Sequence, residues 1–118
     1  MRLTEISYDT ARPVEGYGPG FFRIGGQVLH GACLITPWDA GPWGGLEDVA
    51  APLALAGKID VLFLGMGKEI AHAPAEFRAA LEEAGIGVEV MASPAACRTY
   101  NVLLSEGRRI ALAVLPVG

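Results

Sequence analysis

The chain has 118 residues, a length that suits one domain spanning residues 1–118. Hydrophobic residues make up 52% of it, charged residues 19%, and the formal net charge is −4. Because no basic run offsets this acidic balance, we expect no nucleic-acid partner and no attraction to an anionic membrane surface. The high apolar content predicts a well-filled core and leaves room for a homodimer contact.

The two cysteines, Cys33 and Cys97, lie in different halves of the chain and belong to no Cys-x-x-Cys or Cys/His array. We therefore expect no metal site. No signal-peptide pattern opens the chain, and no apolar run reaches the ~20 residues that a membrane span needs. A cytoplasmic location is the default expectation. Cys97 falls near a predicted helix N-terminus, where the helix dipole lowers a thiol pKa, but a core position is the preferred interpretation.

The first third of the chain consists of short strand patterns and loops rich in glycine and proline. Residues 2–8 fit a strand, and residues 11–20 have the composition of an irregular loop. Two further strands are predicted at 21–24 and 28–35. The link between them, Gly25-Gly26, suits the type I′ turn of a β-hairpin.

The middle of the chain changes from loop to helix to strand. Residues 36–45, which include both tryptophans, are predicted to form a loop. Residues 46–56 have apolar side chains at helical spacing, and Pro52 means that this helix is either kinked or begins late with the proline in its first turn. The apolar run at 59–64 is typical of a strand covered on both faces, which belongs inside a sheet.

The second half alternates strand and helix. A helix is predicted at 74–84 and a strand at 86–91. Ser93 and Pro94 are the residue types of a helix N-cap and a first helical position, so a last helix begins there. A core strand at 110–115 ends the pattern. Helices between consecutive strands are the mark of a layered α/β fold.

A glycine turn, Gly65-Met66-Gly67-Lys68, directly follows the buried strand. It fails the dinucleotide-binding fingerprint because Ile70 stands where the third glycine would be, and it fails the P-loop pattern because Leu62 stands where the first glycine would be. Two interpretations stay open. The turn is either a tight exit that lets another backbone come close, or a site whose backbone N–H groups face an anion.

The last helix contains the polar segment Thr99-Tyr100-Asn101. Threonine and asparagine are poor helix formers, so their place in mid-helix asks for a reason beyond propensity. A structural polar lock that ties the helix to a neighbouring loop by hydrogen bonds is the leading explanation, and a ligand contact is the second. The predicted buried stripe of this helix is Ala96, Tyr100, Leu103 and Leu104.

Four motifs in order give the chain a resemblance to a known family: Gly65-Met66-Gly67, the strand segment 85–91, Thr99-Tyr100-Asn101 and Glu106-Gly107-Arg108. With these, the chain resembles the small single-domain family of mitochondrial complex I (NADH dehydrogenase) assembly factor 3 and the adipogenesis-associated domain protein. The resemblance implies a three-layer α/β fold with a central mixed β-sheet flanked by helices, here with an N-terminal β-hairpin. The family usually has threonine in the glycine turn, so Met66 removes a hydroxyl there.

Two classes of function follow. By the resemblance, the first is a non-enzymatic binding or assembly-type module, linked to respiratory-complex biogenesis, with an unidentified protein partner and no cofactor. The second is a small-molecule or anion-binding domain, or a modest enzyme, with a pocket at the carboxyl ends of the strands. The sequence has no recognisable set of nucleophile, base and orienter, which favours binding over catalysis. The candidate pocket residues are Gly65, Met66, Gly67, Lys68, Ser93, Cys97, Arg98 and Asn101, with His72 as a further polar candidate.

Overall fold

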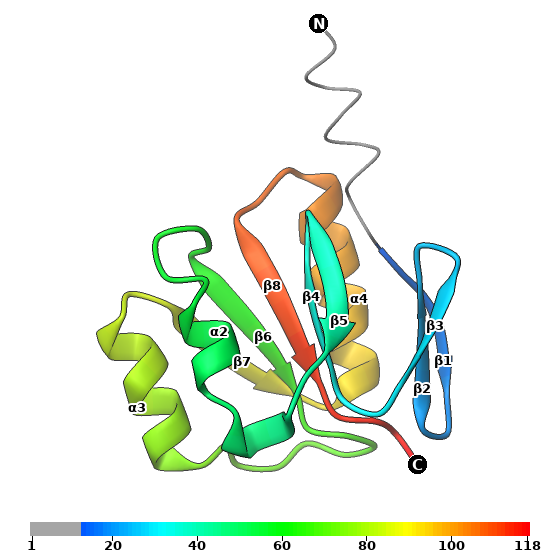
Figure 1. The fold of residues 1–118 in the computed structure, drawn as a ribbon, viewed down its shortest axis with the longest axis horizontal. Helices are drawn as coiled ribbons and strands as arrows, with labels where there is room; N and C mark the ends of the chain where they lie inside the picture. Colours follow the sequence, from blue (N-terminus) through cyan, green and yellow to red (C-terminus); the bar gives the residue numbers. More distant parts are fainter. Residues whose placement is uncertain (1–12) are drawn as a thin grey trace, which may run out of the picture.

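The computed structural model describes residues 13–118 and contains two β-sheets with helices packed around the larger one (Figure 1). The larger sheet is mixed and has the strand order β5-β4-β8-β6-β7, and the smaller one has the order β1-β2-β3. The α/β fold that the residue pattern predicts, and the central mixed sheet that the family resemblance implies, are both confirmed. The predicted strand at 2–8 lies outside the described residues. The elements are β1 (Val14–Gly18), β2 (Phe21–Ile24), β3 (Gln27–His30), β4 (Cys33–Thr36), β5 (Asp39–Pro42), the 3-10 turn η1 (Gly45–Glu47), α2 (Ala50–Leu53), β6 (Val61–Gly65), α3 (Ala75–Glu83), β7 (Gly87–Met91), α4 (Ser93–Ser105) and β8 (Ile110–Val114).

The smaller sheet contains the predicted hairpin. Ile24 pairs with Gln27 across Gly25-Gly26, and the two glycines have φ angles of 57° and 81°. Positive φ at both central positions is the requirement of a type I′ turn, so this prediction is confirmed. The loop predicted at 11–20 is wrong for residues 14–18, which form β1. Pairing with β2 outweighs the local glycine content, and the register shift after Val14 marks an irregularity in that strand.

Two other segments differ from the sequence prediction. The apolar run 28–35 is two strands in two sheets, because the chain turns at Gly31, whose φ is 80°, before β4 begins. Hydrophobicity alone cannot show where a strand changes sheets. The loop predicted at 36–45 contains β5, which pairs antiparallel with β4. As an edge strand, β5 can contain Pro42 without losing an interior hydrogen bond.

Strand β6 lies inside the larger sheet, as predicted. It pairs in parallel with β7 on one side and with β8 on the other. Leu62 and Leu64 belong to the core cluster under α2 and α3, whereas Phe63 belongs to the cluster under α4. Burial on both faces explains the unbroken apolar run of this strand.

The predicted helices exist, but their ends differ. In place of the predicted helix 46–56, the structure has η1 and the short helix α2. Pro52 lies in the first turn of α2, so the alternative of a helix that begins late is confirmed over that of a kinked helix. Pro74 is the N-cap residue of α3 instead of its first helical residue. The prediction of Ser93 as the N-cap of α4 is also wrong, because Ala92 has that position and Ser93 is the first helical residue.

The helices cover opposite faces of the larger sheet, with α2 and α3 on one face and α4 on the other (Figure 1). The chain passes from β6 through α3 to the edge strand β7, and then from β7 through α4 back past β6 to β8. The smaller sheet extends the core beneath α4 with Val14, Phe22 and Ile24. The connections that leave β6 and β7 therefore diverge to opposite faces, and in open α/β sheets such a divergence is where ligand crevices form.

Candidate functional site

The divergence point at the carboxyl ends of β6 and β7 is filled by the protein itself. The backbone N–H of Gly67 donates to Ser93 Oγ at 2.9 Å, and the Ser93 hydroxyl donates to the carbonyl of Leu115 at 2.7 Å. In return, the Ser93 N–H donates to the Gly67 carbonyl at 2.7 Å. Ser93 is fully buried. The N–H and hydroxyl groups that an anion would use are thus engaged in internal hydrogen bonds.

Gly65 and Gly67 make this contact possible. A Cβ atom at Gly65 would lie 2.7 Å from Ser93 Oγ and 2.8 Å from Ser93 Cα, so only glycine lets the turn approach α4 this closely. Gly67 has a φ of 98°, which favours glycine for a second reason. Between them, the half-buried side chain of Met66 packs in the core under α2 and α3. Lys68 is exposed.

Cys97 and Cys33 are buried in the core beneath α4. The pKa of Cys97 is raised from 9.0 to about 12; burial is the largest cause, the nearby Cys33 adds to the rise, and Arg98 opposes it. Burial likewise raises the pKa of Cys33 to about 11. Desolvation therefore outweighs the effect of the helix N-terminus, and at neutral pH the thiolate that nucleophilic chemistry needs is scarce.

Arg98 lies on the outer surface of α4 and is exposed. It lines a shallow hollow of about 350 Å³ together with Thr99, Val102 and Leu103. None of the Gly65–Gly67 turn residues lines this hollow. The structure therefore brings Gly65, Gly67 and Ser93 together but leaves Arg98 facing a separate part of the surface.

The polar segment of α4 reaches three different parts of the molecule. Asn101 accepts a hydrogen bond from the Val14 N–H at 2.9 Å and donates one to the Val14 carbonyl at 2.9 Å. The Thr99 hydroxyl donates to Met91 Sδ at 3.7 Å. Tyr100 is fully buried in the core, and burial raises the pKa of its hydroxyl well above the usual value. Asn101 thus connects α4 to strand β1, whereas the neighbouring segment expected from the sequence was a loop.

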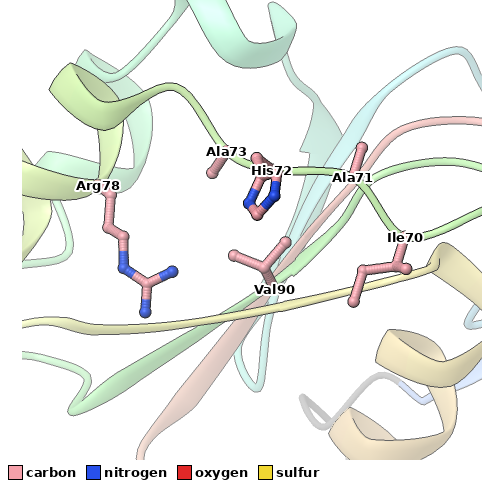
Figure 2. A pocket seen from close by; sticks show the side chains of 6 residues that line it. All are labelled: Ile70, Ala71, His72, Ala73, Arg78 and Val90. Carbon is pink, nitrogen blue, oxygen red and sulfur yellow. The ribbon is translucent and has the colours of Figure 1, made fainter.

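A separate pocket lies beside the edge strand β7 (Figure 2). Its volume is about 250 Å³, and the imidazole of His72 and the guanidinium of Arg78 both line it, next to Val90. Arg78 is anchored on both sides, because its Nε donates to Glu82 Oε2 at 3.1 Å and its Nη2 donates to the Val88 carbonyl at 3.1 Å. The sequence predicts His72 as a candidate but not Arg78, whose one local signal is the i, i+4 spacing to Glu82. The remaining lining residues are Ile70, Ala71 and Ala73.

Among the described residues, neither a metal-binding cluster nor a membrane-spanning helix is found. No three His, Cys, Asp or Glu side chains there gather closely enough to hold a metal ion. In addition, none of the helices between residues 13 and 118 is both long and apolar enough to cross a membrane.

Relatives with known sequences cover nearly the whole chain. An uncharacterised protein of Rhodobacter capsulatus is 50% identical over 117 residues, which are 99% of this chain and 94% of that protein. NADH dehydrogenase [ubiquinone] 1 alpha subcomplex assembly factor 3 of Danio rerio is 34% identical over 110 residues, which are 87% of this chain and 63% of that protein. The human protein of the same name is 28% identical, and the matched region spans 60% of it. The chain therefore corresponds to less than two thirds of these assembly factors.

Solved structures and a family model agree with these relatives. The crystal structure of an outer membrane protein from Bartonella henselae has a TM-score of 0.84 and 33% identity, over 93% of this chain and 98% of that one. The solution structure of a Mth938-like domain from Bordetella pertussis has a TM-score of 0.76 and 26% identity, over 91% and 87%. The family model described as "Protein of unknown function (DUF498/DUF598)" matches residues 14–115. The chain belongs to this family, and it is similar in sequence to the complex I assembly factor 3 proteins.

Proposed function

We propose that this protein is a non-enzymatic binding module, one α/β domain in the cytoplasm, that takes part in the assembly of a respiratory complex by contacting a protein partner. Its similarity to proteins named as NADH dehydrogenase assembly factors supports an assembly-type role. The partner that we infer is a subunit or an assembly intermediate of NADH dehydrogenase. No cofactor takes part in this role.

One contrast carries the proposal. The described side chains of the nucleophilic type at the start of α4, Ser93 and Cys97, are buried and committed to the interior. Large apolar side chains are exposed instead, and exposed aromatic and aliphatic groups are what a protein interface uses. They are Tyr17, Val28, Trp38, Ile70 and Val102.

Deletion of the gene in its native host tests the proposal. We expect a loss of assembled NADH dehydrogenase, measured as NADH oxidation by isolated membranes and as the holo-complex on a native gel. Succinate dehydrogenase in the same membranes is the control and should be unchanged. Complementation with the wild-type gene should restore the complex. Normal amounts of active NADH dehydrogenase in the deletion strain would contradict an assembly role.

A small-molecule or anion site is the second candidate function, and the pocket beside β7 is the observation that favours it. A guanidinium and an imidazole in a pocket of about 250 Å³ suit a carboxylate or a phosphate. A thermal-shift screen with phosphate and small carboxylates tests this function: a ligand should raise the melting temperature of the wild type and of Arg98→Gln but not of Arg78→Gln. If no anion shifts the melting temperature, this second function is excluded.

A further inference from the structure

Strand β7 has a free edge. The backbone N–H and C=O groups of its odd-numbered residues point toward β6. The Gly87 N–H donates to the Asp60 carbonyl, and the Met91 carbonyl accepts from the Met66 N–H. The backbone groups of Val88 and Val90 therefore point away from the sheet, because successive residues of a parallel strand bond to opposite sides. Within residues 13–118, β7 pairs with β6 alone.

The hydrogen bond of Arg78 confirms this direction. Its Nη2 donates to the outward carbonyl of Val88 at 3.1 Å, so that carbonyl is occupied. The N–H groups of Val88 and Val90 and the carbonyl of Val90 have no hydrogen-bond partner in the described part of the chain. Three backbone groups thus stand ready for another strand, with the guanidinium of Arg78 at one end of the row.

The other edge of the same sheet is protected. Strand β5 is short, it contains Pro42, which has no N–H to donate, and β3 of the smaller sheet lies against it. The sequence of β7, Gly-Val-Glu-Val-Met, contains no proline. Its one charged side chain, Glu89, points to the face opposite to Val88 and Val90. The two edges therefore differ in what they offer to an incoming strand.

The pocket beside this edge supplies a recess for a side chain and a site for a charge. Ile70, which is 69% exposed, and Val90 form its apolar part. His72 and Arg78 form its polar part; in Figure 2 the imidazole of His72 lies directly above Val90 and the guanidinium of Arg78 lies to its left. Arg78 donates from Nε to Glu82 and from Nη2 to the Val88 carbonyl. Its Nη1 donates to no acceptor among the described residues and is therefore available to an acceptor of a partner. A carboxylate is the group that a guanidinium binds best.

We propose that the free edge of β7 is the docking site for an extended peptide segment of a partner protein, and that this segment carries a carboxylate. The segment adds a strand by pairing with Val88 and Val90, and its carboxylate binds Arg78 next to His72. This inference rests on the proposed function, because it names the surface with which the binding module holds its partner. The carboxylate comes either from an acidic side chain or from a chain terminus.

Selection from a phage-displayed library of short random peptides tests the site. With peptides displayed at a free C-terminus, we expect enriched sequences that combine β-branched residues with a carboxylate, either an Asp or Glu side chain or the terminal group. A synthetic copy of an enriched peptide should shift the amide NMR signals of Val88 and Val90. Its affinity should fall about tenfold for Arg78→Gln and stay unchanged for Arg98→Gln, an exposed arginine on α4. Amidation of the peptide C-terminus distinguishes the two sources of the carboxylate, and N-methylation of the paired peptide residues should abolish binding without any change in the protein.

The site would be overturned if no peptide is enriched, if an enriched peptide binds Arg78→Gln as well as wild type, or if the NMR shifts are confined to other strands. Shifts of Val88 and Val90 that grow with protein concentration in the absence of peptide would assign the edge to a second copy of the chain and also overturn the proposal. Failure of the β7 site can be distinguished from failure of the proposed assembly role. If Arg78→Gln restores NADH dehydrogenase in the deletion strain as fully as wild type, the β7 site is wrong while the assembly role stands.

Discussion

Two neighbouring regions at the carboxyl half of the larger sheet use polar groups in opposite ways. The first, the α4 junction, consists of Gly65, Gly67, Ser93 and Leu115, and its polar groups are satisfied by one another in the interior. The second, the β7 edge, consists of Val88 and Val90 with the side chains of His72 and Arg78. There, backbone groups and a guanidinium nitrogen face outward.

The difference shows why position in the fold does not identify a binding site. The α4 junction lies where the connections of a doubly wound sheet diverge, the usual place for a ligand. In this chain the hydroxyl of Ser93 occupies the position where a ligand oxygen would meet the Gly67 N–H. The β7 edge is not a place where fold rules predict a ligand. Of the two regions, however, it is the one whose backbone groups lack hydrogen-bond partners among the described residues. Substitutions should therefore affect stability at the junction and binding at the edge.

Gly65→Ala should have the largest effect on stability. The new Cβ would lie 2.8 Å from the Cα of Ser93, a backbone atom that cannot rotate away, so the turn and α4 must separate. We expect a loss of about 3 kcal/mol in the free energy of unfolding, measured by urea denaturation. Gly41→Ala is the control, since nothing lies within 4 Å of its added Cβ, and it should be neutral within about 0.5 kcal/mol. Equal effects of the two variants would contradict the close packing of the junction.

Ser93→Ala should have the next largest effect. It leaves the Gly67 N–H and the Leu115 carbonyl without their shared partner in a buried place, which costs about 2 kcal/mol. Arg78→Gln at the β7 edge should cost only about 0.5 kcal/mol, because the ion pair with Glu82 is about half exposed. Urea denaturation of both variants measures the two losses in the free energy of unfolding. A larger loss for Arg78→Gln than for Ser93→Ala would reverse the comparison between the two regions.

Asn101→Ala should loosen the smaller sheet more than the larger one. It removes both hydrogen bonds between α4 and Val14, and we expect a loss of about 1.5 kcal/mol. Amide hydrogen exchange should show faster exchange in β1 and β2 than in β6 and β8. Val102→Ala, an exposed change one residue further along α4, is the matched control. Unchanged exchange at Val14 in Asn101→Ala would refute the polar lock.

Much of the larger sheet and its helices follows from the sequence, because each signal there is local. The apolar run of β6 indicates burial at its own positions. Gly85, which follows α3 and has a φ of 88°, indicates the backbone geometry at the end of that helix. The smaller sheet is harder to predict. Strand β1 contains two glycines and forms through pairing with β2, and the break at Gly31 sends one apolar run into two sheets. Non-local pairing leaves little trace in composition.

The candidate site shows the same limit. The sequence predicts one pocket that includes Ser93, Cys97, Arg98 and Asn101 because they follow one strand, yet on a helix these side chains point in different directions. Ser93 meets the glycine turn, Asn101 meets β1, and Arg98 faces outward. The β7 edge depends on strand order, since only the order shows that Val88 and Val90 have no neighbour on one side. No local pattern marks Arg78 as a neighbour of that edge.

The smallest predicted effect concerns the thiol of Cys97, which lies one helical turn beyond Ser93 in the closed region. Its pKa is raised from 9.0 to about 12 in the folded protein, chiefly by burial, so well below pH 9 the thiol is protonated in both states and contributes no pH dependence to stability. Above pH 9 the unfolded chain releases the proton while the folded chain keeps it, so stability falls as pH rises toward 12. Between pH 8 and pH 10 we expect this thiol to lower the free energy of unfolding by about 1 kcal/mol. Urea denaturation of wild type and Cys97→Ala at both pH values measures the contribution of this thiol together with its coupling to Cys33, because the remaining groups are present in both proteins. Parallel losses in the two proteins would mean that water reaches Cys97, and that the core beneath α4 is less closed than its contacts indicate.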